Sequence, residues 1–173
     1  MAWKLSSVPC FLKLFHFIMS IDSPSTLAID PSPFAFGIVC ARFNESLTQS
    51  LLDRVKTVLR EQGEPAELVI ERVPGSHEVP AGLSLLAESG RFSCLIGLGV
   101  VIKGSTSHHH LVAESAGHAI QSLVIRHTLP IINGIVVTDN LATAEERITG
   151  SLDRGREFAQ AALEMAQFRQ KWI

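Results

Sequence analysis

The feature of this sequence that most restricts its fold is a set of short apolar runs, each followed by a polar turn and then a helical repeat. In the run Cys94–Val101 every residue is apolar or glycine. Such a run is typical of a strand covered on both faces, because a solvated face would carry alternate polar residues. The segment 103–107 ends the run, and its Ser105 and Thr106 offer hydroxyl groups of the kind that cap helix N-termini.

The same order of elements recurs along the chain. Strand and helix alternate four times, which predicts a parallel sheet with right-handed crossovers. The expected architecture is a flavodoxin-like α/β fold, a three-layer α/β/α sandwich whose four-stranded parallel sheet has helices on both faces. The strands are expected at Phe34–Cys40, Leu68–Val73, Cys94–Val101 and Pro130–Val137, and the helices at 47–59, 80–89, 111–128, 142–147 and 154–169.

The first 33 residues differ in composition from the rest. The run Cys10–Met19 is apolar but is interrupted by Lys13 and His16, so it is too short and too broken for a membrane-spanning helix. It also lacks a good signal-cleavage site, and translation starting at Met19 is one interpretation. We expect residues 1–33 to form an extension and an arm, poorly ordered or packed on a neighbouring subunit, and residues 34–173 to form one domain.

Charge and cysteine content exclude several classes of protein. The net charge is −2 and no basic stripe is visible, which argues against nucleic acid as a partner. Two of the three cysteines, Cys40 and Cys94, lie inside apolar runs. We interpret them as buried thiols of a protein in a reducing compartment, and therefore expect a cytoplasmic protein without a membrane partner.

The polar residues that follow the strands define a candidate site. In parallel α/β sheets, ligands bind at the carboxyl ends of the strands. Here Ser105 and Thr106 precede a helix, whose free N–H groups favour anions, and His108 adds an imidazole, a common acid–base group in enzymes. An anion cradle beside an imidazole suits chemistry on a small phosphorylated molecule. The alternatives are an ordinary helix cap and a solvated histidine.

For other polar and aromatic residues the sequence allows both a functional and a structural interpretation. Phe43 either stacks on a flat heterocycle or covers the edge of the core. Asn133 lies in an apolar strand, where a buried amide needs partners, either on a ligand or on a neighbouring loop. Arg147 either clamps a phosphate or is a surface arginine, and Glu78 is either a ligand or a first-turn acid favoured by the helix dipole.

Several other functions lack their sequence signals. The consecutive histidines 108–110 would point about 100° apart on a helix, so they cannot easily converge on one metal ion. A receiver domain requires acidic residues at the end of its first strand, and this sequence has none there. No Walker or dinucleotide-binding glycine pattern occurs either.

Taken together, several ordered stretches resemble one family, lumazine synthase (6,7-dimethyl-8-ribityllumazine synthase). The resemblance extends from about Phe36 to Ala166. The matching stretches are Ala41–Asn44, Val73–Pro80, Gly99–His108, Leu129–Gly134, Glu145–Arg147 and Ala161–Met165.

This resemblance implies a reaction and a set of roles. The family joins 5-amino-6-(D-ribitylamino)uracil to 3,4-dihydroxy-2-butanone 4-phosphate in riboflavin synthesis, releases phosphate and water, and needs no metal or organic cofactor. By the resemblance, His108 is the general acid/base. The pyrimidine would lie against Phe43, Asn133 and the backbone of Val100, Val101 and Ile102. The ribityl chain would lie against Ser76, His77 and Glu78, and the phosphate against Ser105, Thr106, Arg147 and Arg154.

The resemblance also implies an assembly. The family forms homopentamers, some of which build larger capsids, and a neighbouring subunit supplies the positions that match Asn133 and Arg147. This chain departs from the family at His77 and Asn133, where aromatic residues are usual, and in the link 149–154, which is one residue shorter. The departures leave two alternatives, a non-catalytic lumazine- or flavin-binding assembly and a related riboflavin-forming enzyme that acts on lumazine.

Overall fold

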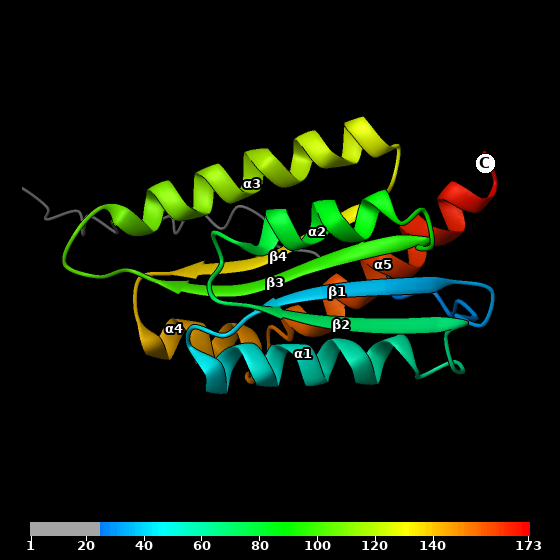
Figure 1. Ribbon diagram of the computed structural model, residues 1–173. Coiled ribbons are helices and arrows are strands. Elements are labelled where there is room, and N and C mark those ends of the chain that lie inside the picture. Colours follow the sequence, from blue (N-terminus) through cyan, green and yellow to red (C-terminus); the bar gives the residue numbers. More distant parts are fainter. Residues whose placement is uncertain (1–24) are drawn as a thin grey trace, which may run out of the picture.

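The computed structural model describes residues 25–173, so the predictions for residues 1–20 lie outside the described part of the chain. Strands and helices alternate as the sequence predicts (Figure 1). The elements are β1 (Ala35–Ala41), α1 (Glu45–Leu59), β2 (Glu67–Val73), α2 (Val79–Glu88), β3 (Cys94–Ile102), α3 (His108–His127), β4 (Ile131–Thr138), α4 (Leu141–Ile148) and α5 (Arg154–Gln170).

The four strands form one parallel sheet in the order β2-β1-β3-β4. In register, Ile38 of β1 lies between Ile70 of β2 and Ile96 of β3. Along the chain, β2 is added on one side of β1 and β3 on the other. The crossover connections therefore run in opposite directions from β1, which leaves a crevice between the carboxyl ends of β1 and β3. Open α/β sheets bind their ligands in such a crevice.

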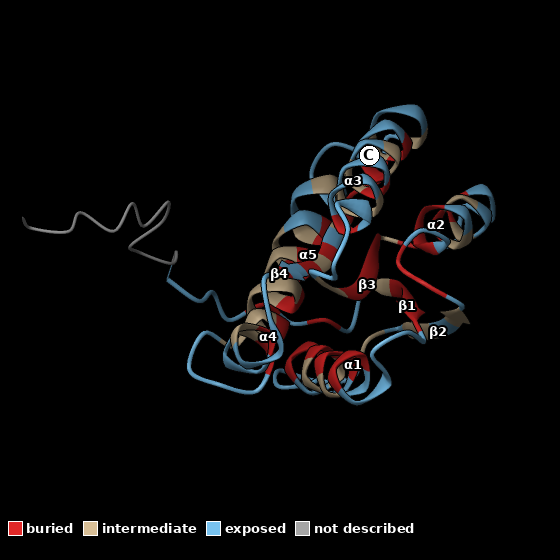
Figure 2. Ribbon diagram, turned by 90° about the vertical axis from the view of Figure 1, so that its left-hand side faces the viewer, coloured by how far each residue is buried: buried red, intermediate tan, exposed pale blue. Residues whose placement is uncertain are grey.

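Two apolar cores cover the two faces of the sheet, and the three-layer prediction is confirmed. Alternate residues of β1 enter different cores: Phe36 and Ile38 pack with α1, α4 and α5, whereas Val39 and Ala41 pack with α2 and α3. The helices turn their buried sides toward the sheet (Figure 2). Because both faces of β1 and β3 are buried, their sequences are continuous apolar runs rather than alternating ones.

The strand β4 is not buried on both faces as β1 and β3 are, because it lies at the edge of the sheet. Its burial alternates, and Asn133 and Val137 are exposed on the face toward α3. The Asn133 side chain accepts a hydrogen bond from the backbone N–H of Ile135 at 3.2 Å. The expectation of a buried amide in a covered strand is therefore wrong for the isolated chain: the far side of β4 has no neighbouring strand among the described residues.

The described part of the arm lies against its own chain. Ile29 is only 3% exposed and belongs to the core under α1 and α5. Further out, the Gln160 side chain of α5 donates a hydrogen bond to the carbonyl of Leu27 at 2.9 Å. The division of the chain at residue 33 stays a prediction, although residues 29–33 lie beside the core.

A charged contact joins α5 to α1. The side chain of Asp153 caps the N-terminus of α5, accepting a hydrogen bond from the Arg156 N–H at 3.1 Å. Arg54 of α1 donates to both carboxylate oxygens of Asp153, and this guanidinium holds the pKa of Asp153 below its usual value. A Cβ on Gly155 would lie 2.6 Å from the Arg54 side chain, so glycine there permits the close approach of the two helices.

The described cysteines are free and buried, as predicted for Cys40 and Cys94. Burial raises the pKa of both thiols, and it outweighs the opposing influence of Arg72 at Cys40. Within the described residues, none of the helices has the length and apolar character needed to cross a membrane.

Candidate functional site

A cavity of about 340 Å³ opens at the carboxyl ends of β1, β2 and β3, where the strand order reverses. Its position is the one expected for a ligand site in an open α/β sheet. Eight of the residues predicted from the sequence line it: Phe43, Ser76, His77, Glu78, Val100, Val101, Ile102 and His108. Three further residues line the cavity without having been predicted from the sequence, namely Asn44, Gly75 and Val112.

The turn after β1 supplies the aromatic wall of the cavity. Phe43 is 71% exposed, so its ring does not cover the core edge of this chain and is free to contact a flat ligand. The next residue, Asn44, has a left-handed backbone (φ 56°, ψ 49°) and precedes the first turn of α1. Its Nδ2 donates to the carbonyl of Val100 at 2.8 Å, which ties this turn to the end of β3.

Asn44 was overlooked although a sequence signal for it exists. Asparagine tolerates the left-handed conformation better than other non-glycine residues and is common at helix starts. The pattern thus indicates a structural residue at the N-terminus of α1. The bond to Val100, which brings Asn44 into the cavity wall, joins residues 56 positions apart and has no local signal.

The turn before α2 forms the adjoining wall, and its Pro74 carbonyl accepts a hydrogen bond from the Phe43 N–H at 3.2 Å. Ser76 is 6% exposed and packs against Gly99 of β3, where an added Cβ would lie 2.4 Å from the Ser76 Oγ. His77 and Glu78 follow, both exposed at the cavity. Glycine at position 99 therefore brings the turn into contact with the strand, and this contact sets the position of the three polar side chains.

The helix α3 brings an imidazole to the cavity. The helix begins at His108, three residues before the expected start, and Ser107 is its N-cap residue. His108 and Val112 lie one turn apart and both line the cavity. His109 is buried, and its Nδ1 lies 3.0 Å from the Thr106 carbonyl oxygen. The ring of His110 lies beside that of His109, with centroids 4.0 Å apart, whereas His108 lines the cavity.

Five predicted site residues do not line the cavity of the single chain. Ser105 and Thr106 are exposed in the loop that leads into α3. Asn133 is exposed on β4, as described above. Arg154, at the start of α5, forms an ion pair with Glu157.

Arg147 of α4 is the most informative of these outlying residues. Its Nε is buried and has no hydrogen-bond partner among the described residues. No described carboxylate forms an ion pair with it either. An unsatisfied guanidinium nitrogen is costly, so the arrangement favours an anionic partner from outside the described chain.

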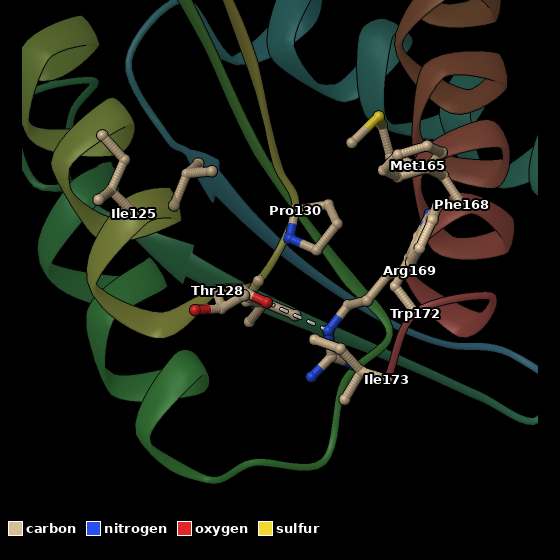
Figure 3. Close-up of a pocket in the computed structure, with 10 residues that line it drawn as sticks. Ile125, Thr128, Pro130, Met165, Phe168, Arg169, Trp172 and Ile173 are labelled. Atoms are coloured by element: carbon tan, nitrogen blue, oxygen red, sulfur yellow. Dashed lines mark hydrogen bonds between the residues drawn. The ribbon is translucent and has the colours of Figure 1, made fainter.

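A larger cavity lies at the other end of α3 and has a different character. It measures about 550 Å³ and is lined mainly by apolar side chains, including Ile125, Met165, Phe168 and Trp172 (Figure 3). Its one charged side chain, Arg169, donates through Nε to the carbonyl of Thr128 at 3.2 Å. With no free titratable side chain on its walls, this cavity is suited to packing rather than to acid–base chemistry.

The chain is similar to proteins of one family. The sequence profile of the family described as 6,7-dimethyl-8-ribityllumazine synthase matches residues 33–170. A protein of that name from Polaromonas sp. is 43% identical over 146 residues, which cover 84% of this chain and 93% of the relative. Proteins of the same name from Nitrosomonas europaea and Cupriavidus pinatubonensis are 37% and 38% identical, over 86% and 83% of this chain and 87% and 83% of their own lengths.

Proposed function

Because the chain belongs to the 6,7-dimethyl-8-ribityllumazine synthase family, we propose that it is a transferase of riboflavin biosynthesis. It condenses 5-amino-6-(D-ribitylamino)uracil with 3,4-dihydroxy-2-butanone 4-phosphate and releases phosphate and water. The observation that carries the proposal is the cavity at the strand ends, which gathers an exposed aromatic ring, a polar turn and an imidazole.

Each wall of the cavity suits one part of the pyrimidine substrate. The exposed ring of Phe43 offers a stacking surface for the heterocycle. Backbone groups of Val101 and Ile102 at the end of β3 provide hydrogen bonds to its edge. Ser76 and Glu78 supply a hydroxyl and a carboxylate for the ribityl hydroxyl groups.

His108 suits the proton transfers of the reaction. An amine adds to the ketone and the adduct loses water to give an imine. Loss of a proton then expels phosphate, and the resulting enol becomes a carbonyl. The second amine adds to this carbonyl and loses a second water, which closes the ring. Each step moves a proton near neutral pH, within the range where imidazole accepts and donates. Holding the two reactants side by side supplies much of the remaining rate, so few catalytic groups are needed.

The phosphate site would be completed by a second subunit. Ser105 and Thr106 precede the N-terminus of α3, which favours an anion, but the described chain brings no arginine to this end of the cavity. In the same chain the Nε of Arg147 is buried without a hydrogen-bond partner among the described residues, and Asn133 is exposed on β4. A homopentamer, in which these residues enter a neighbour's cavity, accounts for both observations, and a larger capsid is compatible with it.

The proposal places the enzyme in the cytoplasm. Cys40 and Cys94 are free thiols, as expected in a reducing compartment. The reaction as proposed uses only side chains and backbone groups of the protein, so no metal or organic cofactor is required.

A steady-state assay of lumazine formation tests the proposal. We expect wild type to turn over, and Arg147→Ala to raise the KM for the butanone phosphate by about 10-fold or more, because it removes a charge-assisted hydrogen bond. Arg60→Ala is the matched control, since Arg60 is a surface arginine that pairs with Glu64 and does not line the cavity. Wild-type protein that binds lumazine without forming it would refute the catalytic proposal and favour a non-catalytic binding assembly.

A further inference from the structure

His77 contacts α3 in a way that the proposed reaction does not explain. Its Nδ1 lies 3.4 Å from the Oγ of Ser115, a residue that no part of the proposed mechanism uses. Ser115 lies seven residues after His108 and three after Val112. These spacings place the three residues on one face of α3, the face that lines the cavity.

The hydrogen of the Ser115 hydroxyl group is already used. The Oγ lies 2.6 Å from the carbonyl oxygen of Leu111 and 3.3 Å from that of Val112. A hydroxyl group has one hydrogen to donate and accepts through its lone pairs. Since the contact to Leu111 is much shorter than the contact to His77, the hydrogen points to Leu111, and a lone pair of Oγ faces the imidazole.

This arrangement determines which nitrogen of His77 carries the proton. Facing a lone pair, Nδ1 is stabilised as the protonated nitrogen. In a neutral imidazole the other nitrogen, Nε2, is then a hydrogen-bond acceptor. We propose that Ser115 is a positioning residue that holds His77 in the Nδ1–H form, so that Nε2 accepts a hydrogen bond from a hydroxyl group of the substrate's polyol chain.

The inference rests on the proposed function for the identity of the polyol, but the tautomer does not depend on activity. Ser76 and Glu78 flank His77 in the sequence and also line the cavity, so the turn presents three polar side chains to a hydroxyl-bearing ligand. As a hydrogen-bond acceptor, the Nε2 of His77 favours a ligand whose side chain carries a hydroxyl group. A chain that lacks the hydroxyl group would leave this nitrogen unsatisfied when the ligand excludes water.

Nuclear magnetic resonance on protein labelled with ¹⁵N in histidine alone tests the tautomer directly, at about pH 8.5, where neutral imidazole dominates. His77→Gln assigns the signals. We expect wild-type Nε2 to resonate as an unprotonated nitrogen, and Ser115→Ala to move the His77 signals toward the Nε2–H form. Ser115→Thr, which keeps the hydroxyl group, should match wild type.

The chain offers a matched control in Ser122 of the same helix. Its Oγ donates to the carbonyl of His118 four residues earlier at 2.9 Å, as Ser115 does to Leu111, and it does not line the cavity. Ser122→Ala should leave the His77 spectrum unchanged. A wild-type His77 in the Nε2–H form, or a spectrum that Ser115→Ala does not alter, would overturn the inference.

Kinetics provide the second readout. Ser115→Ala should raise the KM for the ribityl substrate by about 3- to 10-fold, the range expected for one hydrogen bond, with the KM for the butanone phosphate unchanged. An unchanged KM for the ribityl substrate would overturn the polyol contact even if the tautomer is as proposed. Inactive wild-type protein with the expected tautomer would instead count against the proposed reaction alone.

Discussion

Replacing Gly99 with alanine is expected to damage the candidate site more than the fold. The new Cβ would lie 2.4 Å from the Oγ and 3.1 Å from the Cβ of Ser76, and at an ordinary 3.6 Å from Ile135. Ser76 is buried, so it has little room to turn away. The turn before α2 must therefore move outward, and it carries His77 and Glu78 with it.

The size of the effect follows from this geometry. Restoring an ordinary contact requires the Ser76 oxygen to move by about 1 Å, and a misplacement of that size can reduce catalysis by up to about 100-fold. Overpacking of this kind costs about 1–3 kcal/mol of stability, which a domain stable by about 5–15 kcal/mol survives. We therefore expect folded Gly99→Ala protein with a kcat/KM for the ribityl substrate reduced by about 10- to 100-fold.

A double-mutant cycle with Ser76→Ala separates this explanation from a general loss of stability. Ser76→Ala removes the oxygen that the new methyl group would meet, so Gly99→Ala should cost much less in that background. Gly97→Ala is the control, because its Cβ would meet Val79 and Leu83 in the core at 2.7 and 2.9 Å. It should lower the free energy of unfolding with less effect on KM. Fully additive losses in kcat/KM for Gly99→Ala and Ser76→Ala would refute the reasoning.

Two further predictions concern stability, measured as the free energy of unfolding in urea. The pKa of Asp153 is lowered by Arg54. The contact therefore stabilises the fold fully above the ordinary carboxyl pKa, near pH 4, and this stabilisation is lost as the pH falls through the lower pKa of the folded state. Asp153→Asn should thus have a lower free energy of unfolding than wild type at pH 7, and should lose less of it between pH 5 and pH 2. An equally steep acid loss in the variant would contradict this cause. Asn44→Ala should cost about 2 kcal/mol, because it removes the bond to Val100 and puts alanine in a left-handed conformation, whereas Asn44→Gly should recover roughly half of that loss. Equal losses in the alanine and glycine variants would show that the backbone conformation contributes nothing.

The sequence predicted the fold well because its signals are local and agree with one another. The continuous apolar run of β3 indicates a strand buried on both faces, and the structure buries it on both faces. The same reasoning failed at β4, whose sequence is nearly as apolar. A strand's place in the sheet depends on which strands it pairs with, and no local pattern in β4 reveals that one side is unpaired.

The candidate site was predictable to the extent that it follows the ends of strands. Phe43, Ser76 and His108 come directly after strands or at a helix start, so the parallel topology brings them together. The contacts that position them were not predictable. The bond from Asn44 to Val100 and the packing of Gly99 on Ser76 depend on side-chain geometry between segments far apart in the sequence.

Two of the residues that the single chain does not gather, Arg147 and Asn133, lie in settings that are unfavourable in an isolated subunit. Arg147 has a buried nitrogen without a hydrogen-bond partner among the described residues, and Asn133 is exposed on β4, a strand at the edge of the sheet. Neither feature stabilises an isolated subunit, since an unsatisfied guanidinium nitrogen and an open strand edge are both unfavourable. Both become favourable if a second copy covers the edge and an anion binds the arginine. The same association would thus relieve the two unfavourable features and bring a cation to the cavity, which is why catalysis by this protein should depend on its assembly.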